Sequence, residues 1–264
     1  SALSGQIPVA INQYDREIRE ETRDLLTQAG LQETISYSLV SKSLLEQVGV
    51  IGEGYPEPLR TFNPMSREQE FMRTSLRGVI LRSAAAGLRI PPGYAALFEI
   101  GRIFIPKDGD LPDEIEHAVA VLAGSNGDSL WDRRATRSGF YEAKSVVEFV
   151  LGRLGIKATF ERGNDPILHP GRTARVLANG IDIGVVGELH PRIITSFDFP
   201  VETVALLDLD LRKLTQQTRW LRHRFNAFSR YPSAERDLAL LVDTQVPADR
   251  LRLVIESNEL VVHV

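Results

Sequence analysis

The sequence predicts an α+β fold in which a mainly antiparallel sheet is flanked by helices. Two apolar runs are typical of buried central strands, and an Asn-Gly pair between two further apolar segments indicates a β-hairpin. Three segments repeat their apolar residues at helical spacing. Strands and helices do not alternate regularly, as they would in a parallel βαβ fold, so the strands are expected to pair mainly antiparallel.

The predicted long helices span residues 14–29, 74–88 and 140–155. In the first of them, Ile18, Leu25 and Leu26 share one apolar stripe among charged residues, and Gly30 follows where a left-handed C-cap belongs. The second contains several small residues that permit close packing against a sheet. The third repeats valine and leucine at helical spacing up to its closing glycine.

A short strand and a short helix are expected between the first two long helices. Ile35, Tyr37 and Leu39 alternate with polar residues, which is the period of a half-buried strand. Ser43 and Glu46 then have the spacing of a capping box, which predicts a short helix after that strand.

The remaining strands of the sheet are expected at residues 96–105, 117–123, 173–178, 181–187 and 204–211. Asn179-Gly180 separates the third and fourth of these strands. Asparagine and glycine both tolerate the positive φ angles of a type I′ turn, whose twist suits an antiparallel hairpin.

A change of composition at residues 219–236, where arginine and aromatic residues are interleaved, indicates a boundary between two units. We therefore predict one domain at residues 1–226 and the start of another at residues 227–264. The second is expected to contain a strand, a helix and a strand at residues 237–243, 247–257 and 260–264. Such a β-α-β fragment buries little surface, so the natural protein is expected to be longer.

Composition excludes several classes of function. The chain has 31 Lys and Arg against 35 Asp and Glu, a formal net charge of −4, so it does not bind nucleic acid through a global positive field. It has no cysteine, which excludes disulfides and cysteine metal sites. We find neither an apolar run long enough to span a bilayer nor a signal peptide, and therefore expect a cytoplasmic protein without a membrane partner.

Three groups of motifs carry a resemblance to a known family. They contain Asn63-Pro-Met-Ser, Phe98-Glu-Ile-Gly-Arg102, and His169-Pro-Gly-Arg172 followed by Gly187-Glu-Leu-His-Pro191. In order and spacing they resemble the β subunits of bacterial-type phenylalanyl-tRNA synthetases, and the resemblance extends across roughly residues 14–240. The segment 231–240 is similar to that family's entry into its anticodon-binding, ferredoxin-like domain.

The resemblance implies a class II synthetase-like module at residues 1–226 that performs no aminoacylation itself. The incomplete β-α-β would then begin the ferredoxin-like domain. The holoenzyme is expected to attach phenylalanine to tRNA(Phe) with ATP and magnesium, in the α subunit, while this part binds no cofactor. The implied partners are the α subunit, tRNA(Phe) and a second copy of the heterodimer. The family's editing region would precede Ser1.

The residues at the expected nucleotide-binding motifs also indicate that this part of the chain performs no aminoacylation. An adenylate site needs arginines on the ATP phosphates, because negative charge gathers there. The candidate strand carries Glu99 and Arg102 but continues into Phe104-Ile-Pro106 rather than the family-typical Arg-x-Glu, and Gly184-Val-Val-Gly187 is followed by Glu188 rather than by arginine. We therefore predict no catalytic, cofactor-binding or metal-binding residue, and no activity of this chain alone.

Other polar residues also favour structural roles. His169 and His190 each precede proline at a turn, and no third metal ligand has convincing spacing. Asp208 and Asp210 point to one side of a predicted strand, as a cation site would require, but their alternation with leucine indicates an ordinary solvated face. No serine has a neighbouring His/Asp arrangement, so no catalytic serine is assigned.

Two sets of residues are candidate contacts. Arginines in the composition boundary could hold tRNA phosphates, or could belong to a linker in which they pair with acids, and the linker is favoured. These arginines are Arg219, Arg222, Arg224 and Arg230. The stripe of Ile18, Leu25 and Leu26 could face the α subunit and the second copy, or could equally belong to the chain's own core.

Two other classes of function remain open. One is an independent enzyme that binds nucleotide in a degenerate class II pocket, and the other is a free-standing RNA-binding module. ATP–pyrophosphate exchange by the isolated chain would indicate the first, and salt-sensitive tRNA binding without the α subunit would indicate the second.

Overall fold

The computed structural model describes residues 14–91, 93–124, 139–218, 230–243 and 246–261 of the 264-residue chain. The chain divides into two compact units, Ser1–His223 and Arg224–Val264. The first contains a large sheet with helices on both faces, and the second contains one helix in its described part. Each unit is described by itself below.

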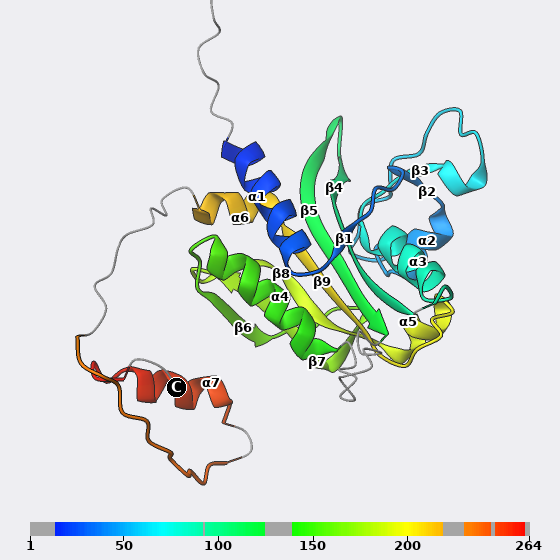
Figure 1. Cartoon of the computed structure of the whole chain (residues 1–264). Coiled ribbons are helices and arrows are strands. Elements are labelled where there is room, and N and C mark those ends of the chain that lie inside the picture. Colours follow the sequence, from blue (N-terminus) through cyan, green and yellow to red (C-terminus); the bar gives the residue numbers. More distant parts are fainter. Residues whose placement is uncertain (1–13, 92, 125–138, 219–229, 244–245, 262–264) are drawn as a thin grey trace, which may run out of the picture. The chain divides into compact units, whose positions relative to one another are not determined.

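A seven-stranded sheet forms the centre of the first unit (Figure 1). Its strands are β1 (Gln32–Glu33), β4 (Tyr94–Lys107), β5 (Asp110–Gly124), β6 (Ala158–Arg162), β7 (Leu168–Ala178), β8 (Ile181–Leu189) and β9 (Val204–Asp210). The spatial order is β1-β4-β5-β9-β8-β7-β6, and every pairing is antiparallel except that of β1 with β4. The predicted α+β class with a mainly antiparallel sheet is confirmed.

The β7–β8 hairpin has the turn that its sequence predicts. Asn179 and Gly180 connect the two strands with φ angles of 50° and 79°. Both angles lie in the left-handed region that a type I′ turn requires at its two central residues. Asn-Gly therefore sets the register of this hairpin.

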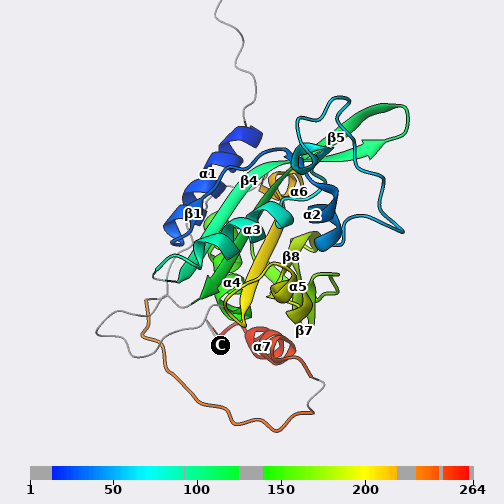
Figure 2. The ribbon, with the colours of Figure 1, turned by 90° about the vertical axis from the view of Figure 1, so that its right-hand side faces the viewer.

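Helices cover both faces of the sheet. One face carries α1 (Tyr14–Gln28), α4 (Phe140–Arg153) and α6 (Leu211–Thr218), and the other carries α2 (Lys42–Gln47), α3 (Arg77–Gly87) and α5 (Pro191–Ser196). In Figure 2, α3 lies in front of the sheet and α4 behind it. Alternate residues of one strand serve the two cores: Leu207 packs on the α4 side and Leu206 on the α3 side. None of the described helices is long and apolar enough to cross a bilayer.

The predicted strand around residue 37 is wrong. Thr34 N still donates to Phe98 O, but the backbone then leaves β4, and Ile35 and Tyr37 are 92% and 77% exposed. Only Leu39–Val40 forms a short strand, β2, which pairs with β3 (Phe71–Met72). Alternation alone cannot form a strand where the sheet has no neighbouring backbone to pair with.

The boundaries of two helices also differ from the prediction. The short helix begins at Lys42, because Ser41 Oγ accepts a hydrogen bond from Leu44 N at 3.2 Å, so the cap is not Ser43. The helix predicted from residue 74 begins at Arg77, and the residues before it are occupied by the contacts described below. A single turn of 3₁₀ helix, η1, spans Arg67–Gln69.

The second unit contains α7 (Ala248–Glu256), which begins directly after Pro247 as predicted. The expected strand at residues 237–243 is wrong, since these residues are exposed and no strand is assigned to them. An extended segment becomes a strand only when another strand pairs with it, and none of the described strands pairs with this one. The final expected strand lies mostly outside the described residues, and Leu260 and Val261 are not in a strand.

Candidate functional site: two ion-pair networks on one sheet face

Three polar residues lie on the sheet face that α3 covers. Glu99 on β4, His117 on β5 and Asp208 on β9 share that face with buried apolar residues of the α3 core, because side chains alternate along each strand. A buried charge requires a partner. Two arginines that lie four residues apart supply the partners, Arg73 directly after β3 and Arg77 as the first residue of α3.

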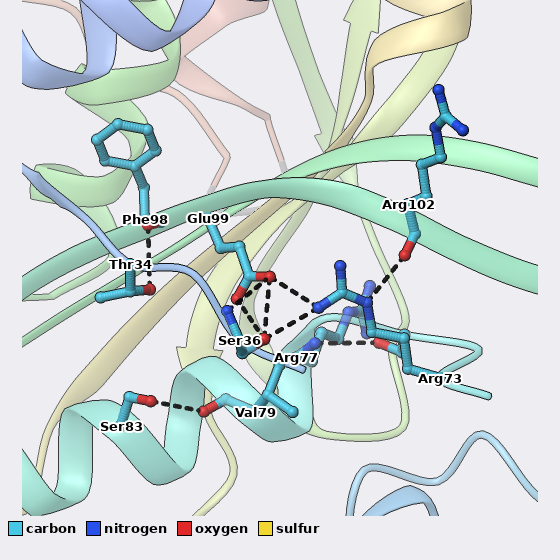
Figure 3. Close-up of polar contacts among 10 residues, drawn as sticks. Thr34, Ser36, Arg73, Arg77, Val79, Ser83, Phe98, Glu99 and Arg102 are labelled. Carbon is cyan, nitrogen blue, oxygen red and sulfur yellow. Dashed lines mark hydrogen bonds and ion pairs between the residues drawn. The ribbon is translucent and has the colours of Figure 1, made fainter. Parts of the chain in front are cut away.

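Arg73 and Glu99 form the first network, which also holds the extended segment after β1 (Figure 3). Arg73 Nη1 lies 2.7 Å from Glu99 Oε1, and the two side chains are only 5% and 3% exposed. Arg73 Nε donates to Arg102 O at 2.9 Å. Ser36 Oγ accepts from Arg73 Nη1 at 2.9 Å and donates to Glu99 Oε2 at 2.7 Å. The network therefore fixes Ser36 although the sheet does not extend to it.

Gly101 makes room for this network. A Cβ atom at this position would lie 2.5 Å from Arg73 Nη2, which is shorter than any ordinary contact. Since the guanidinium is fixed by bonds to Glu99, Ser36 and the Arg102 carbonyl, it cannot move aside without losing them. Glycine is needed here for space rather than for backbone conformation.

Arg77 forms the second network with two carboxylates. Its Nε donates to Asp208 Oδ2 at 2.6 Å and its Nη1 to Asp165 Oδ2 at 2.7 Å. His117 Nδ1 lies 2.6 Å from Asp208 Oδ1, and Asp165 Oδ1 accepts from Ile167 N at 3.0 Å. The network joins the start of α3 to β5, to β9 and to the loop between β6 and β7.

Burial and charge act in opposite directions on these groups. Burial would raise the pKa of Asp208, but Arg77 and His117 outweigh it and hold that pKa well below its usual range. Burial would lower the pKa of His117, but the charge and hydrogen bond of Asp208, with a further contribution from Asp210, raise it. The pKa of Arg77 is likewise raised by its two carboxylates against the effect of burial. The network therefore favours the charged form of each group.

A cavity of about 200 Å³ lies beside the second network. Its polar wall contains Arg77, His117, Asp165 and Asp208, together with Thr74 from the segment that precedes α3. Ser75, Tyr55 and apolar side chains form the rest of the wall. The cavity is the natural candidate for a ligand site on this face.

Comparisons with known proteins identify the family. Residues 3–211 match the family model described as the phenylalanyl tRNA synthetase beta chain CLM domain. The chain belongs to this family.

Curated relatives agree with this assignment. The chain is 38% identical over 247 residues to the phenylalanine–tRNA ligase beta subunit of Dehalococcoides mccartyi, which covers 94% of this chain and 30% of that protein. It is 35% identical over 246 residues to the beta subunit of Halalkalibacterium halodurans, with 91% and 30% covered. The chain therefore spans about 30% of the length of the curated relatives it matches.

Solved structures agree on the fold. The pyrrolysyl-tRNA synthetase of Desulfitobacterium hafniense superposes with a TM-score of 0.56 at 16% identity, covering 76% of this chain and 67% of that one. A second structure of that synthetase, PylSc, gives a TM-score of 0.54 at 15% identity. At such low identity the likeness shows the fold alone, which is that of a class II aminoacyl-tRNA synthetase.

The prediction that Asp208 and Asp210 form a solvated face of this β-chain module is wrong. Both are 7% exposed, because β9 is the central strand of seven and helices cover both of its faces. Asp208 belongs to the Arg77 network, and Asp210 Oδ1 accepts from Lys213 N at 3.0 Å in the first turn of α6. Alternation with leucine therefore indicated two buried faces, one of them charged.

The residues that had been compared with nucleotide-binding motifs are engaged elsewhere. Arg102, on the candidate strand, lies 2.7 Å from Glu114 Oε2 and is exposed. Glu188, which follows the glycine pattern, pairs with Arg172 and accepts a hydrogen bond from Phe140 N. These contacts are between neighbouring strands and with the start of α4.

The two histidines at turns lie close together. The rings of His169 and His190 are stacked with centroids 6.4 Å apart. Their Nδ1 atoms accept hydrogen bonds from the backbone N–H groups of Gly171 and Arg192, two residues further on in each case. These bonds stabilise the turns, which is the structural role that the sequence favoured. The described residues contain no group of three metal-ligating side chains.

The candidate contact residues fall in different places. Ile18, Leu25 and Leu26 are buried in the core between α1 and the sheet, which is the second of the two alternatives that the sequence left open. Arg230 is exposed. The other candidate tRNA contacts lie outside the described residues, namely Arg219, Arg222 and Arg224.

Sequence reasoning missed Arg73, Arg77, Asp165 and His117 as members of buried networks. The available signal was a single carboxylate within an otherwise apolar run, as at Glu99. Such a carboxylate predicts a cation nearby, because an unpaired buried charge costs several kcal/mol or more. The signal does not say which of the arginines supplies it.

Proposed function

We propose that this chain is a non-catalytic structural module of a phenylalanine–tRNA ligase β subunit. In this proposal it supports assembly with the α subunit and orients tRNA(Phe). The complete enzyme, a heterotetramer built from two heterodimers in the cytoplasm, joins phenylalanine to tRNA with ATP and magnesium, and the α subunit performs the chemistry. Residues 227–264 begin the ferredoxin-like, anticodon-binding domain, of which α7 is the described helix.

The pairing of arginines with carboxylates on the sheet carries this proposal. Formation of an aminoacyl-adenylate from ATP, with release of pyrophosphate, requires cations that are free to face the triphosphate. Arg73, Arg77 and Arg102 are each held by at least one carboxylate of this chain. The cavity of about 200 Å³ is also below the ~300–1,000 Å³ usual for drug-sized ligands. These contacts favour stability over nucleotide binding.

Exposed apolar side chains support a role in assembly. Phe62 and Met65 are fully or almost fully exposed in the loop before η1, and Ile35 and Tyr37 project from the segment whose backbone Ser36 anchors. Large apolar side chains held in water are typical of protein interaction surfaces. We therefore place the contact with the α subunit at these two segments, rather than at the buried stripe of α1.

An exchange assay tests the absence of chemistry. The isolated chain is expected to catalyse no ATP–pyrophosphate exchange with phenylalanine, whereas the complete enzyme does. Exchange by the isolated chain that Arg102→Ala abolishes would overturn the structural role and would favour an independent enzyme.

Size-exclusion chromatography with the α subunit tests assembly. Co-elution is expected for the chain, and the double substitution Phe62→Ser with Met65→Ser is expected to abolish it while leaving the melting temperature unchanged. Leu111→Ser, at the exposed tip of the β4–β5 hairpin, is the matched control and should co-elute. Complexes of equal stability for all three proteins would place the interface elsewhere.

The candidate arginines test tRNA orientation. In the complete enzyme, Arg222→Ala and Arg224→Ala are expected to weaken tRNA(Phe) binding and to reduce its salt dependence, since each removes one phosphate contact. Arg230→Ala and Arg219→Ala extend the same series. Unchanged affinity at every salt concentration would contradict a role of these arginines in tRNA binding and would favour the alternative, in which they belong to a linker.

A further inference from the structure

Two stacked histidines lie at the end of the β7–β8 hairpin opposite its Asn-Gly turn. His169 is the second residue of β7, His190 directly follows β8, and Leu168 pairs with Leu189 beside them. The ring centroids are 6.4 Å apart, and the ring planes differ by 26°. Both histidines are partly exposed, so solutes can reach this end of the hairpin.

The backbone fixes which nitrogen of each ring carries the hydrogen. Gly171 N–H donates to His169 Nδ1 at 3.0 Å, and Arg192 N–H donates to His190 Nδ1 at 3.2 Å. A ring nitrogen that accepts a hydrogen bond carries no hydrogen itself, so the hydrogen of each neutral ring is on Nε2. Two Nε2–H donors therefore belong to one stacked pair.

This arrangement favours an oxygen acceptor over a metal ion. A metal ion needs a nitrogen lone pair, but in each ring Nδ1 uses its lone pair for a backbone N–H and Nε2 carries the hydrogen. An oxyanion, by contrast, accepts from both Nε2–H groups without any change of tautomer. Hydrogen bonds of this kind are about 2.9 Å long, so two oxygens of one tetrahedral oxyanion can bridge rings at this separation.

The backbone that carries both rings is held in place by further hydrogen bonds. Thr173 Oγ1 donates to His169 O at 2.6 Å across the irregular start of β7. His190 N donates to Ile167 O at 2.8 Å, and Ile193 N donates to His190 O at 2.8 Å. Donors that are already ordered lose less conformational entropy when a ligand binds. The pair is therefore prepared for a ligand before it arrives.

The charges next to the pair favour an anion. Arg172 pairs with Glu188, so these two charges balance each other. Arg192, two residues after His190, donates through Nη2 to Pro166 O, which is a neutral carbonyl. Within the described residues the charge of Arg192 is therefore not balanced by a carboxylate. One positive charge matches the single negative charge of a phosphodiester or of a singly charged phosphate.

We propose that His169 and His190 bind the oxygens of a phosphate group. Nε2–H of each ring donates to a different phosphate oxygen, and Arg192 supplies the balancing charge. The same chemistry belongs to free inorganic phosphate and to the phosphodiesters of an RNA backbone. The site lies outside the residues to which the proposed function assigns assembly or tRNA contacts, so it goes beyond that function.

An NMR titration of the chain with inorganic phosphate, at constant pH and ionic strength, tests this site. The Hε1 resonances of His169 and His190 are expected to shift together and to saturate with one dissociation constant. His117, which belongs to the buried Arg77 network, is the internal control and should not shift. A titration without a saturable shift of the two resonances overturns the proposal.

Acetate at the same concentrations tests the selectivity of the site. A planar carboxylate offers two oxygens to the two rings and Arg192, whereas phosphate offers more than two in a tetrahedral arrangement. Acetate is therefore expected to bind about tenfold more weakly, the equivalent of one lost charged hydrogen bond. Equal affinity for the two anions would contradict a site for phosphate.

Asparagine and glutamine separate ligand binding from the stabilisation of the turns. Asparagine retains an oxygen acceptor at the position of Nδ1 and has no atom at that of Nε2, whereas glutamine retains an N–H donor near Nε2 and loses the acceptor. His169→Asn and His190→Asn are each expected to keep the melting temperature and to weaken phosphate binding about tenfold. His190→Gln is expected to lower the melting temperature but to bind phosphate more tightly than His190→Asn.

A role in the turns alone gives a different pattern. It requires only Nδ1, so both asparagine variants would then bind phosphate with the affinity of the unaltered chain, and this result overturns the proposal. If an asparagine variant fails to fold, the titration of the unaltered chain with phosphate and acetate still decides between the two roles.

A short single-stranded oligoribonucleotide distinguishes the two sources of phosphate. If the site serves an RNA backbone, the oligonucleotide is expected to shift the same two histidine resonances and to compete with inorganic phosphate. If the site serves free phosphate, inorganic phosphate alone shifts them. Neither readout involves the α subunit or ATP–pyrophosphate exchange, so failure of this proposal would leave the structural role of the module intact.

Discussion

Arg77 Nε lies 2.6 Å from Asp208 Oδ2, although the two residues are 131 positions apart in the sequence. The pair joins the first residue of α3 to the central strand of the sheet, and both side chains are nearly buried. Because Asp165 shares the same guanidinium, a single side chain connects three distant parts of the first unit. The pair is therefore a main determinant of how α3 is placed on the sheet.

Removal of one member of this pair is expected to destabilise the chain strongly. Arg77→Met leaves Asp165 buried without its cation and Asp208 with His117 alone, and such losses cost about 3–5 kcal/mol. Chemical denaturation measures the free energy of unfolding. Arg102→Met, which removes an exposed pair with Glu114, is the control and should cost less than about 1 kcal/mol. Equal effects would show that burial does not strengthen the Arg77 pairs.

Stability is expected to fall on the alkaline side because of His117. The pKa of His117 in the folded chain is raised above the ordinary value of 6.5. The folded chain therefore binds the proton on His117 more tightly than the unfolded chain does. The resulting stabilisation is complete below pH 6.5 and is lost as the pH rises through the raised folded value. His117→Gln should remove this dependence, which unfolding measured at a series of pH values would show. A pH profile identical to that of the unaltered chain would contradict it.

Asp208 is expected to produce the opposite dependence in acid. Its pKa in the folded chain is depressed from the ordinary 3.8 by Arg77 and His117 against the effect of burial. Its contribution is therefore present above pH 3.8 and is lost as the pH falls towards the folded value. In Asp208→Asn the melting temperature should depend less steeply on pH in this acid range. A slope as steep as in the unaltered chain would assign the acid dependence to other carboxylates.

Gly101→Ala is expected to disrupt the Arg73 network without changing any charge. The added Cβ would lie 2.5 Å from Arg73 Nη2, and overpacking of this kind costs about 1–3 kcal/mol. Gly87→Ala, in the last turn of α3, has no atom within 4 Å of the added methyl group and is the matched control, expected to be neutral or stabilising. Thermal unfolding of both variants measures the difference in stability. An unchanged melting temperature of Gly101→Ala would show that Arg73 can move aside.

The predictable part of the fold depended on local signals. The β7–β8 turn follows from Asn179-Gly180, since two adjacent residues contain the whole requirement for positive φ angles. The α1 stripe followed from the spacing of Ile18, Leu25 and Leu26. A strand also needs a neighbouring strand that is distant in sequence. The strand predicted from the alternation of Ile35 and Tyr37 is wrong, because the sheet does not continue beside them.

The candidate site was less predictable than the fold. Glu99 and Asp208 are carboxylates within apolar strands, but the sequence analysis expected Asp208 on a solvated face and assigned an arginine to neither. Arg73 reaches Glu99 across 26 positions and Arg77 reaches Asp208 across 131. The same alternation of charged residues and leucine describes an exposed strand and a central one, so the burial of Asp208 depended on its place in the sheet.

The sequence by itself therefore determined the helices, the hairpin, the antiparallel α+β class and the resemblance to the synthetase β subunits, because each is contained in residues near one another or in ordered motifs. Only the tertiary structure decided which charges are buried, which arginine neutralises which carboxylate, and that a cavity lined by Thr74, whose hydroxyl has no partner among the described residues, lies beside them. The physical reason is that burial and ion pairing depend on which strands and helices become neighbours, and the order β1-β4-β5-β9-β8-β7-β6 brings together residues that no local pattern relates.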